Sequence, residues 1–375
     1  MGCGGDLRGA RRHRVAAAFV SALVLLSPAC ADTGARGPGS SVSSAASPAP
    51  SARPAPDPDP VVAAAGDIAC GANNPNLSGL NPTACQMRAT AGEIAAIAPQ
   101  YQLPLGDTQY AAVPERQGVQ PAAADYRASY NTSWGAVQVP GMTVRPVPGN
   151  HEYGDMDRSD SELANGSTYF ANFGPNGLNQ LPVGVTGPAN DYFSYDIPVT
   201  GGSWHLIGLD SECNGGVGGC GPGSPQERWL RKDLTAHPNT CILAYWHEPR
   251  WGGSTGAAGN TAYSALWSDL VSAHATLVLN GHDHYYQNLT PLDADGNFSP
   301  TGVTQFIVGT GGEDLETPPS ARDPRVLAQD NQHFGVLKLT LHASSASYAF
   351  QTTTGAPPRG ATIPCSTNPP AQPRP

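Results

Sequence analysis

The chain has 375 residues, of which 39% are hydrophobic and 13% charged, and its formal net charge is −10 at pH 7. This acidic balance disfavours a nucleic-acid scaffold, because such proteins neutralise phosphates with basic side chains. It does not exclude an anionic substrate, since bound cations reverse the local field.

Residues 1–31 are expected to form a secretory signal peptide. Four arginines precede an apolar run over residues 15–26, which is too short to span a bilayer. An Ala-Cys-Ala cleavage site ends the segment. We expect a secreted, extracellular protein without a transmembrane span, although Cys30 also allows a lipid anchor at the cell surface.

Composition divides the rest of the chain into three regions. Residues 32–60 are rich in Ala, Pro and Ser and have almost no large apolar residue, so we expect a disordered linker. Residues 61–355 carry the apolar runs of a folded domain. Residues 356–375 are expected to be a Pro-rich tail that Cys365 anchors in part.

Two of the eight cysteines lie in the expected signal peptide, which leaves six in the rest of the chain. An even number in an exported chain favours disulfides, although spacing alone leaves the pairing open. A thiolate metal site is disfavoured because no C-x-x-C spacing occurs. We expect bonds that join Cys70 with Cys85, Cys213 with Cys220, and Cys241 with Cys365.

In chain order, the first half of the domain alternates strands and helices, read from short apolar runs and from helical spacing. The expected strands are 61–65, 101–105 and 142–147, and the expected helices are 83–98 and 122–134. A long insertion rich in Gly, Asn and Ser follows over residues 154–190. Loops of that length are usually functional or mobile.

The second half opens with two alternating runs, 191–197 and 203–210, which predict adjacent antiparallel strands. The later elements are expected to be helices over 225–236 and 261–272 and strands over 241–246, 275–279, 302–308 and 334–341. Two groups of strands with helices between them predict an α/β fold of four layers, α/β/β/α. This is a two-sheet β sandwich flanked by helices.

Five short fragments that directly follow predicted strands contain most of the metal-capable side chains. They are Gly66-Asp67, Gly106-Asp107-Thr108-Gln109-Tyr110, Gly149-Asn150-His151-Glu152, Tyr245-Trp246-His247-Glu248 and Gly281-His282-Asp283-His284. In open α/β sheets, function gathers at the rim formed by the carboxyl ends of the strands. The pattern therefore predicts a dinuclear metal site at that rim.

The donors in these fragments are carboxylates, an amide and imidazoles, which suit Fe, Zn or Mn. Asp107 lies in the middle of the set and is the natural bridge between two ions. His282 and His284 alternate along an extended segment, so they are expected to point to opposite sides and serve different ions. Two such ions would neutralise the charge of a phosphate ester and supply hydroxide.

In sequence order, the fragments resemble the motifs of the calcineurin-like metallophosphoesterases and, within them, of the purple acid phosphatases. The family pattern is Gly-Asp, Gly-Asp-x-x-Tyr, Gly-Asn-His-Glu or Asp, a strand that ends in His, and Gly-His-x-His. The resemblance makes residues 61–355 a metallophosphoesterase catalytic domain. Many relatives have a metal-binding His where this chain has Ala69, and Tyr110 replaces that ligand as in the purple enzymes.

The resemblance also implies a role for each residue. The first ion, ferric in the purple enzymes, would be held by Asp67, Asp107, Tyr110 and His284. The second ion, a divalent Fe, Zn or Mn, would be held by Asp107, Asn150, His247 and His282. His151 would be the catalytic residue that stabilises the phosphoryl group or protonates the leaving oxygen. Metal-bound hydroxide would attack in line.

Structural roles are the alternative for several residues. Asp and Asn after Gly often form turns, and Tyr110 could serve packing. Asp283 is expected to be structural, and Glu152 and Glu248 are expected to lie outside the ligand set. The run Gly309-Thr310-Gly311-Gly312 is expected to be a tight turn near the rim, because no Lys follows it as in a phosphate loop.

We therefore expect an exported, metal-dependent phosphoric ester hydrolase, similar to acid phosphatases, that acts on small phosphate monoesters. Two alternatives stay open. One is a phosphodiesterase or nucleotidase that uses the same site. The other is a surface binding protein that keeps the fold without catalysis.

Overall fold

The computed structural model describes residues 59–112, 119–154, 166–173, 192–213, 217–238, 241–256, 258–319, 323–356 and 359–366. These belong to one unit of the chain, Ala55–Pro375. The expected signal peptide, Cys30, nearly all of the linker, most of the insertion and the end of the tail lie outside the described residues. Among the described residues, no helix is both long and apolar enough to span a bilayer.

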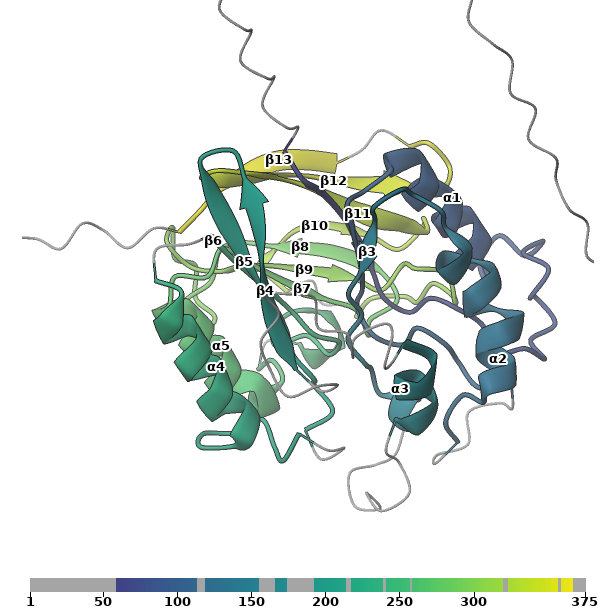
Figure 1. Ribbon diagram of the computed structural model, residues 1–375, viewed down its shortest axis with the longest axis horizontal. Helices are drawn as coiled ribbons and strands as arrows, with labels where there is room; N and C mark the ends of the chain where they lie inside the picture. The colour runs from purple at the N-terminus through teal and green to yellow at the C-terminus, as the bar shows by residue number, and fades with distance from the viewer. Residues whose placement is uncertain are drawn as a thin grey trace, which may run out of the picture. The chain divides into compact units, whose positions relative to one another are not determined.

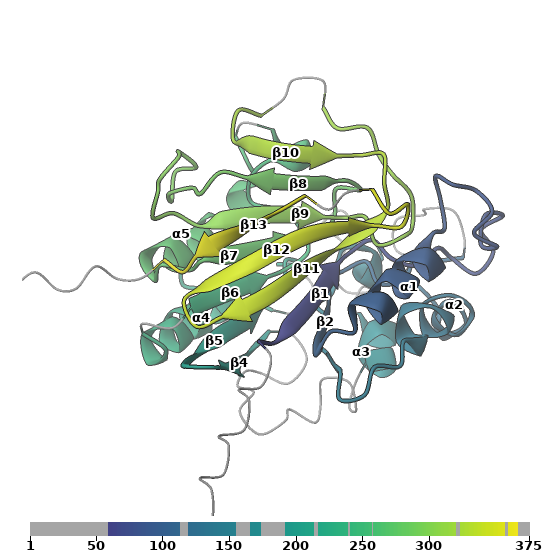
Figure 2. The same ribbon diagram turned by 90° about the horizontal axis from the view of Figure 1, so that it is seen from above.

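A first sheet combines strands from the two ends of the domain (Figures 1 and 2). Its order is β13-β12-β11-β1-β2-β3. β1 runs parallel to β2 and antiparallel to β11. The bounds are β1 (Val61–Ala65), β2 (Tyr101–Pro104), β3 (Thr143–Val144), β11 (Gly335–His342), β12 (Ser345–Thr352) and β13 (Arg359–Pro364).

A second sheet holds the middle of the chain in the order β10-β8-β9-β7-β6-β5-β4. β5, β6, β7 and β9 run parallel, so their carboxyl ends meet at one rim. The bounds are β4 (Phe193–Val199), β5 (Gly202–Gly208), β6 (Cys241–Tyr245), β7 (Leu277–Asn280), β8 (Tyr286–Leu289), β9 (Thr304–Val308) and β10 (Val326–Asp330).

Helices cover the outer faces of the two sheets. α1, α2 and α3 lie beside the first sheet and α4 and α5 beside the second (Figure 1). Their bounds are α1 (Met87–Ile97), α2 (Ala123–Ala128), α3 (Ser167–Phe173), α4 (Pro225–Ala236) and α5 (Ser264–Ser272). Short 3-10 turns are η1 (Tyr130–Thr132), η2 (Trp134–Ala136), η3 (His151–Tyr153), η4 (Gly253–Thr255) and η5 (Thr261–Tyr263).

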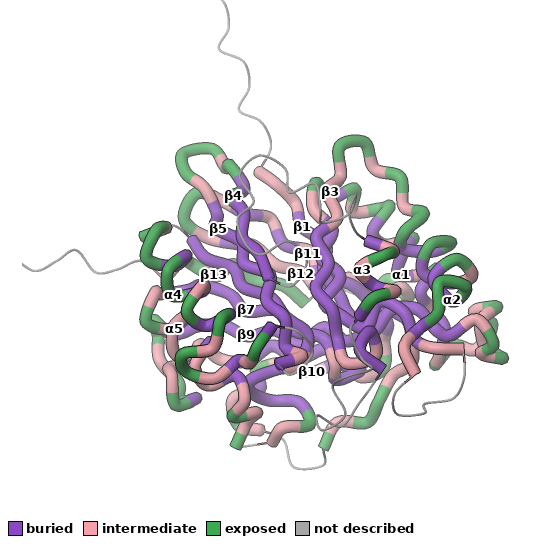
Figure 3. Tube along the Cα trace, turned by 60° about the horizontal axis from the view of Figure 1, so that its bottom comes forward, coloured by how far each residue is buried: buried purple, intermediate pink, exposed green. Residues whose placement is uncertain are grey.

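Two hydrophobic clusters hold these layers together. The larger one joins both sheets, for example Leu206 and Leu337, and extends beneath α1 to Ile94. The smaller one places the alternate face of the second sheet, including Ile207, against Leu230 of α4 and other residues of α4 and α5. Successive residues of a strand point to opposite faces of the sheet. Because both faces are covered, most of the strand trace is buried (Figure 3). The predicted four-layer sandwich is confirmed.

Several elements are shorter than the sequence predicts, and two of them lose more than half of their expected length. The helix expected over 122–134 ends at Ala128, because Gln109 Oε1 accepts the N–H of Tyr130 and the Ser133 hydroxyl donates to the Ser129 carbonyl. The strand expected over 142–147 is reduced to the two residues of β3, because prolines at 146 and 148 lack the N–H that a ladder needs.

All three expected disulfides are present, which confirms the predicted pairing. They join Cys70 with Cys85, Cys213 with Cys220 and Cys241 with Cys365. The last one fastens the end of the described chain to β6. It follows β13, a strand that forms within the segment expected to be a Pro-rich tail.

Candidate metal centre

Each fragment lies at or beyond the carboxyl end of a strand. Asp67 follows β1, Asp107 follows β2, and Asn150 lies beyond β3 in the first sheet. His247 follows β6, and His282 follows β7 in the second sheet. The first sheet thus supplies the oxygen donors and the second sheet the imidazoles, and the two sets meet between the sheets.

A first group of donor atoms surrounds the hydroxyl of Tyr110. This hydroxyl lies 3.3 Å from Asp67 Oδ1 and 3.3 Å from Asp107 Oδ2. It also lies 2.9 Å from His284 Nε2, which is 3.3 Å from Asp67 Oδ1. The structure therefore brings together the four side chains that the resemblance assigns to a first ion.

A second group adjoins the first through the same carboxylate oxygen. His247 Nε2 lies 3.1 Å from Asp107 Oδ2 and 3.0 Å from Asn150 Oδ1. His282 Nδ1 lies 3.1 Å from the same Asn150 oxygen. Asp107 Oδ2 thus belongs to both groups, and His282 and His284 belong to different ones.

These separations are those of coordination spheres. Ligand atoms about 2.1 Å from an ion lie roughly 3 Å apart when they subtend a right angle. The distances within the two groups run from 2.9 to 3.3 Å. Carboxylate, phenol, amide and imidazole donors also suit hard or borderline cations. The residues therefore fit two metal ions, one for each group, and Asp107 would contribute to holding both.

The close approach of the fragments requires glycine at two positions. A Cβ atom on Gly149 would lie 2.3 Å from Asp107 Oδ1. A Cβ atom on Gly106, whose φ is +83°, would lie 2.5 Å from His247 Nδ1. Any larger residue at either position would displace a donor side chain.

Three of the donor residues adopt left-handed backbone conformations that non-glycine residues rarely adopt. Their φ values are 60° for Asp67, 42° for Asp107 and 73° for His282. Each such conformation costs on the order of 1–3 kcal/mol and persists only where the surroundings enforce it. Strain of this kind clusters at functional sites.

Charge coupling between the donors is strong. Burial would raise the pKa of Asp107, but the imidazoles of His247 and His151 outweigh it and hold the pKa below its usual range. Burial would lower the pKa of His247, but the Asp107 carboxylate outweighs it and raises the pKa well above its ordinary value. Burial and nearby carboxylates, Asp107 first, also raise the pKa of Tyr110 well above its ordinary value. The phenol therefore keeps its proton until a cation replaces it.

Glu152 connects the loop that carries Asp107 with the loop that carries Asn150 through hydrogen bonds. Its Oε1 accepts hydrogen bonds from the Thr108 N–H at 2.7 Å and from the Thr108 hydroxyl at 2.8 Å. Its Oε2 accepts the N–H of Gly149 at 2.7 Å. Burial and the charge of Asp107 raise the pKa of Glu152 to about 7. Glu152 thus lies outside both groups and positions the loops that carry Asp107 and Asn150.

Two of the histidines are oriented by groups behind them. His247 Nδ1 donates to the carbonyl of Leu105 at 2.8 Å. His284 Nδ1 donates to the carboxylate of Asp314, which no sequence motif indicated. Such outer partners fix the tautomer of a ligating imidazole. In both cases the opposite nitrogen, Nε2, is the one that faces the donor groups.

His151 reaches the centre from the side that solvent can approach. The backbone N–H of His151 donates to Asp107 Oδ1 at 2.9 Å, and the ring Nε2 lies 3.9 Å from Asp107 Oδ2. The side chain is 17% exposed, and its ring lies against Tyr110 with the centroids 4.2 Å apart. The imidazole is adjacent to both groups without lying in either.

The remaining polar residues of the fragments face away from the two groups. Asp283 Oδ1 accepts the N–H of Ser254 at 2.9 Å, which fits the structural role expected for it. Glu248 accepts the hydroxyl of Tyr263 at 2.7 Å. The turn at 309–312 packs on the first fragment, with the Gly311 N–H donating to the carbonyl of Gly66 at 2.9 Å.

No family model and no curated protein matches the sequence. Among solved structures, a purple acid phosphatase from yellow lupin (Lupinus luteus) seeds matches with a TM-score of 0.58 at 16% identity. The match covers 81% of this chain and 53% of the lupin chain, so this chain spans about half of that enzyme.

Two further structures match over nearly their whole length. The anchor in the inner membrane complex of Plasmodium has a TM-score of 0.55 at 14% identity, over 83% of this chain and 92% of its own. A dimetal phosphatase from Danio rerio has a TM-score of 0.50 at 14% identity, over 83% of this chain and 100% of its own. Together with the two-sheet topology, these matches show that the chain has the fold of the calcineurin-like metallophosphoesterases.

Proposed function

We propose that the protein is an exported dinuclear-metal phosphoesterase that hydrolyses phosphate monoesters. The observation that carries the proposal is the sharing of Asp107 Oδ2 by two groups of donors, because a bridging carboxylate is what a pair of adjacent ions requires. The fold likeness to a purple acid phosphatase and a dimetal phosphatase supports the same reading. The three disulfides support export to an oxidising compartment.

In this proposal the first ion is held by Asp67, Asp107, Tyr110 and His284, and the second by Asp107, Asn150, His247 and His282. Such a pair, when bound, neutralises phosphate oxygens and lowers the pKa of a coordinated water. Tyr110 supports ferric iron in the first position, because a phenolate is a hard donor. A visible absorption band from tyrosinate-to-Fe(III) charge transfer tests that assignment.

His151 is the residue of this chain that we propose acts on the substrate. Its Nε2 lies 3.9 Å from the shared Asp107 oxygen and outside both groups, so it can hold a proton next to the substrate's leaving oxygen. Its backbone N–H donates to Asp107 Oδ1, which positions the main chain of His151, and its ring lies against the ring of Tyr110. The His151→Ala variant is expected to lose roughly 10²–10⁴-fold in kcat while it keeps its metal content. Unchanged kcat would remove His151 from the mechanism.

The experiment that tests the function is hydrolysis of p-nitrophenyl phosphate before and after chelation. We expect phosphate release that chelation abolishes and added metal restores. The Asp107→Asn variant should lose roughly 100-fold or more, while Asp295→Asn, which removes the same charge from an exposed loop, should not change the rate. Equal activity of Asp107→Asn and wild type would refute the proposal.

The same centre would also serve a phosphodiesterase or nucleotidase. The rates on p-nitrophenyl phosphate and bis-p-nitrophenyl phosphate decide between the monoester and the diester. A third reading is a surface protein that binds without catalysis; the same fold occurs in an anchor of the inner membrane complex of Plasmodium. Metal-replete protein that hydrolyses neither ester would favour that reading.

A further inference from the structure

The two groups of donors differ in the acceptor that is bonded to Nδ1 of a histidine. His284 Nδ1 donates to the carboxylate of Asp314, and Glu313 Oε2 lies 3.9 Å from the same nitrogen. His247 Nδ1 donates instead to a neutral acceptor, the carbonyl of Leu105, at 2.8 Å. The outer partners of His284 in the first group are therefore carboxylates, and the outer partner of His247 in the second group is an uncharged carbonyl.

The donors themselves increase this asymmetry. Apart from the shared Asp107, the first group contains the carboxylate of Asp67 and the phenol of Tyr110, which becomes an anion when it binds metal. Apart from the same Asp107, the second group contains only Asn150, His247 and His282, which bind a metal as uncharged ligands. Glu313 and Asp314 add two carboxylates at Nδ1 of His284, whereas Nδ1 of His247 has only a carbonyl oxygen as its acceptor.

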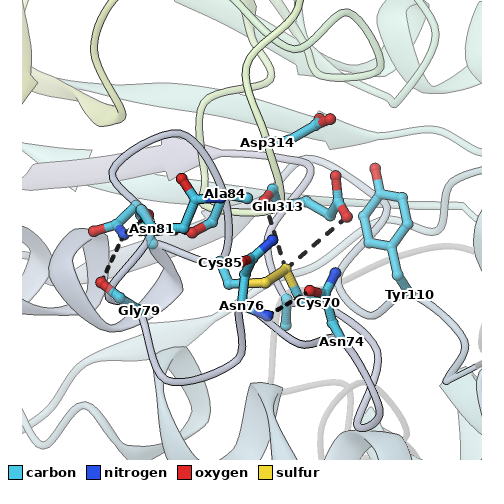
Figure 4. The surroundings of a disulfide bond; sticks show 12 residues. Cys70, Asn74, Asn76, Gly79, Asn81, Ala84, Cys85, Tyr110, Glu313 and Asp314 are labelled. Atoms are coloured by element: carbon cyan, nitrogen blue, oxygen red, sulfur yellow. Dashed lines mark hydrogen bonds between the residues drawn. A yellow bond between two sulfur atoms is a disulfide. The ribbon is translucent and has the colours of Figure 1, made fainter.

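The backbone of Glu313 is hydrogen-bonded both to the first group and to the segment that carries a disulfide. The Glu313 N–H donates to the carbonyl of Asp67 at 3.0 Å, and the Cys85 N–H donates to the carbonyl of Glu313 at 2.7 Å. The sulfur of Cys70, bonded to Cys85, lies 3.5 Å from that Glu313 carbonyl oxygen. Figure 4 shows the Glu313 side chain between this disulfide and the ring of Tyr110.

Two carboxylates near the second group, Glu152 and Glu248, have other partners. Glu152 accepts from the backbone of Thr108 and Gly149, and Glu248 accepts from Tyr263 and Asn260. Neither supplies His247 Nδ1 with its acceptor, which is the Leu105 carbonyl. The carboxylate behind an imidazole is thus a feature of the first group.

We propose that Glu313 and Asp314 make the first group selective for a trivalent ion and leave the second group to a divalent one. This rests on the proposed dinuclear centre and adds two residues outside its ligand set. A carboxylate behind a ligating imidazole raises its basicity, and additional negative charge favours the ion of higher charge. Glu313 and Asp314 act through His284 and Tyr110, so they are positioning residues.

The test loads metal-free, full-length protein with a mixture of Ga³⁺ and Zn²⁺ and measures both elements after gel filtration. Ga³⁺ is a redox-inert trivalent probe, so no activity is needed. Wild type is expected to retain one equivalent of each. Asp314→Asn and Glu313→Gln should each lower the preference for Ga³⁺ over Zn²⁺ by roughly 10–100-fold, with total metal unchanged. Glu316→Gln is the matched control, because it removes the same charge from an exposed position two residues further along the loop.

A second readout uses the iron-loaded protein. Asp314→Asn should raise the Fe(III)/Fe(II) potential of the first position and shift the tyrosinate charge-transfer band, and Asp314→Glu should restore both in part. A merely structural role would not move the potential in a variant that unfolds at the wild-type temperature.

Unchanged Ga³⁺ preference in both variants would overturn the proposal. So would a third equivalent of Zn²⁺ in wild type that Asp314→Asn abolishes, because His284, Glu313 and Asp314 would then form a separate cation site. The proposed function and the proposed metal selectivity can be refuted independently of each other. Protein that binds Ga³⁺ and Zn²⁺ selectively but hydrolyses no phosphate ester would refute the proposed function and leave this inference standing.

Discussion

A buried histidine outside the metal centre, His205, tests how much a charged side chain in the core contributes to stability. His205 of β5 is 1% exposed, and its Nε2 lies 2.7 Å from Asp233 Oδ2 on α4. Its Nδ1 lies 2.8 Å from Asp196 Oδ1 on β4, whose side chain is 51% exposed. The ring of His237 stacks on it with the centroids 3.8 Å apart. With a carboxylate on each nitrogen, the imidazole is held as a cation.

The sign of the pH dependence follows from these contacts. Burial would lower the pKa of His205, but the hydrogen bonds and charges of Asp233 and Asp196 outweigh it and raise the pKa. A raised histidine pKa stabilises the folded state fully below the unfolded value of about 6.5, and this contribution is lost as the pH rises through the folded value. The network should therefore stabilise the protein most at acid pH.

The His205→Gln variant measures this contribution. At pH 5 it leaves Asp233 buried with the Ser194 hydroxyl at 2.8 Å as one remaining partner. Removing one member of a buried ion pair costs about 3–5 kcal/mol. The retained Ser194 bond and the exposed side of Asp196 reduce our expectation to about 2–3 kcal/mol at pH 5. As the pH rises through the raised pKa of His205, the ion-pair contribution is lost, so the destabilisation by the variant should be smaller at pH 9 than at pH 5.

The assay is urea unfolding of wild type and variant at pH 5 and pH 9 with the disulfides intact. His333→Gln is the matched control, because His333 pairs with Asp330 at 3.0 Å but its side chain is 31% exposed. The control should change stability by no more than about 1 kcal/mol at either pH. An equal loss at both pH values for His205→Gln would refute the reasoning and make the residue a packing element.

Two further predictions concern packing at the rim and the end of the chain. Gly149→Ala should abolish metal binding measured by elemental analysis, because the new Cβ would lie 2.3 Å from Asp107 Oδ1, whereas Gly92→Ala meets nothing within 4 Å and should keep the metal. Metal bound normally by the first variant would contradict this. Replacing Cys241 and Cys365 together by Ser should lower the free energy of unfolding by about 2–5 kcal/mol, checked by denaturant titration. An unchanged free energy of unfolding would mean that this disulfide does not contribute to the stability of the protein.

The elements that carry the metal centre were largely predictable, because buried strands of a parallel sheet read as short apolar runs. Val61–Ala65 is such a run, and the predicted strand matches β1. β8 has the sequence Tyr-Gln-Asn-Leu and β10 Val-Leu-Ala-Gln-Asp, and neither was predicted. Their polar side chains hide the strand signal, and only pairing with neighbours makes them strands.

The donors could be predicted from the sequence, but their outer partners could not. Asp67 and Asp107 stand in recognisable Gly-Asp pairs after apolar runs. Asp314 lies 30 residues from His284 in a loop without periodicity, so no local pattern links the two. The Leu105 carbonyl behind His247 is a backbone atom that no sequence motif specifies. Such contacts depend on tertiary packing.

The division of donors between the two sheets has a consequence for how the protein matures. Asp67, Asp107, Tyr110 and Asn150 come from the first half of the domain, and His247, His282 and His284 from the second. Neither half alone contains all the donors of either group, so both groups are complete only after the two sheets have docked. Metal loading is then a late event, which follows the slow, long-range pairing of β1 with β11. If the chain is exported unfolded, it must acquire its ions outside the cytoplasm.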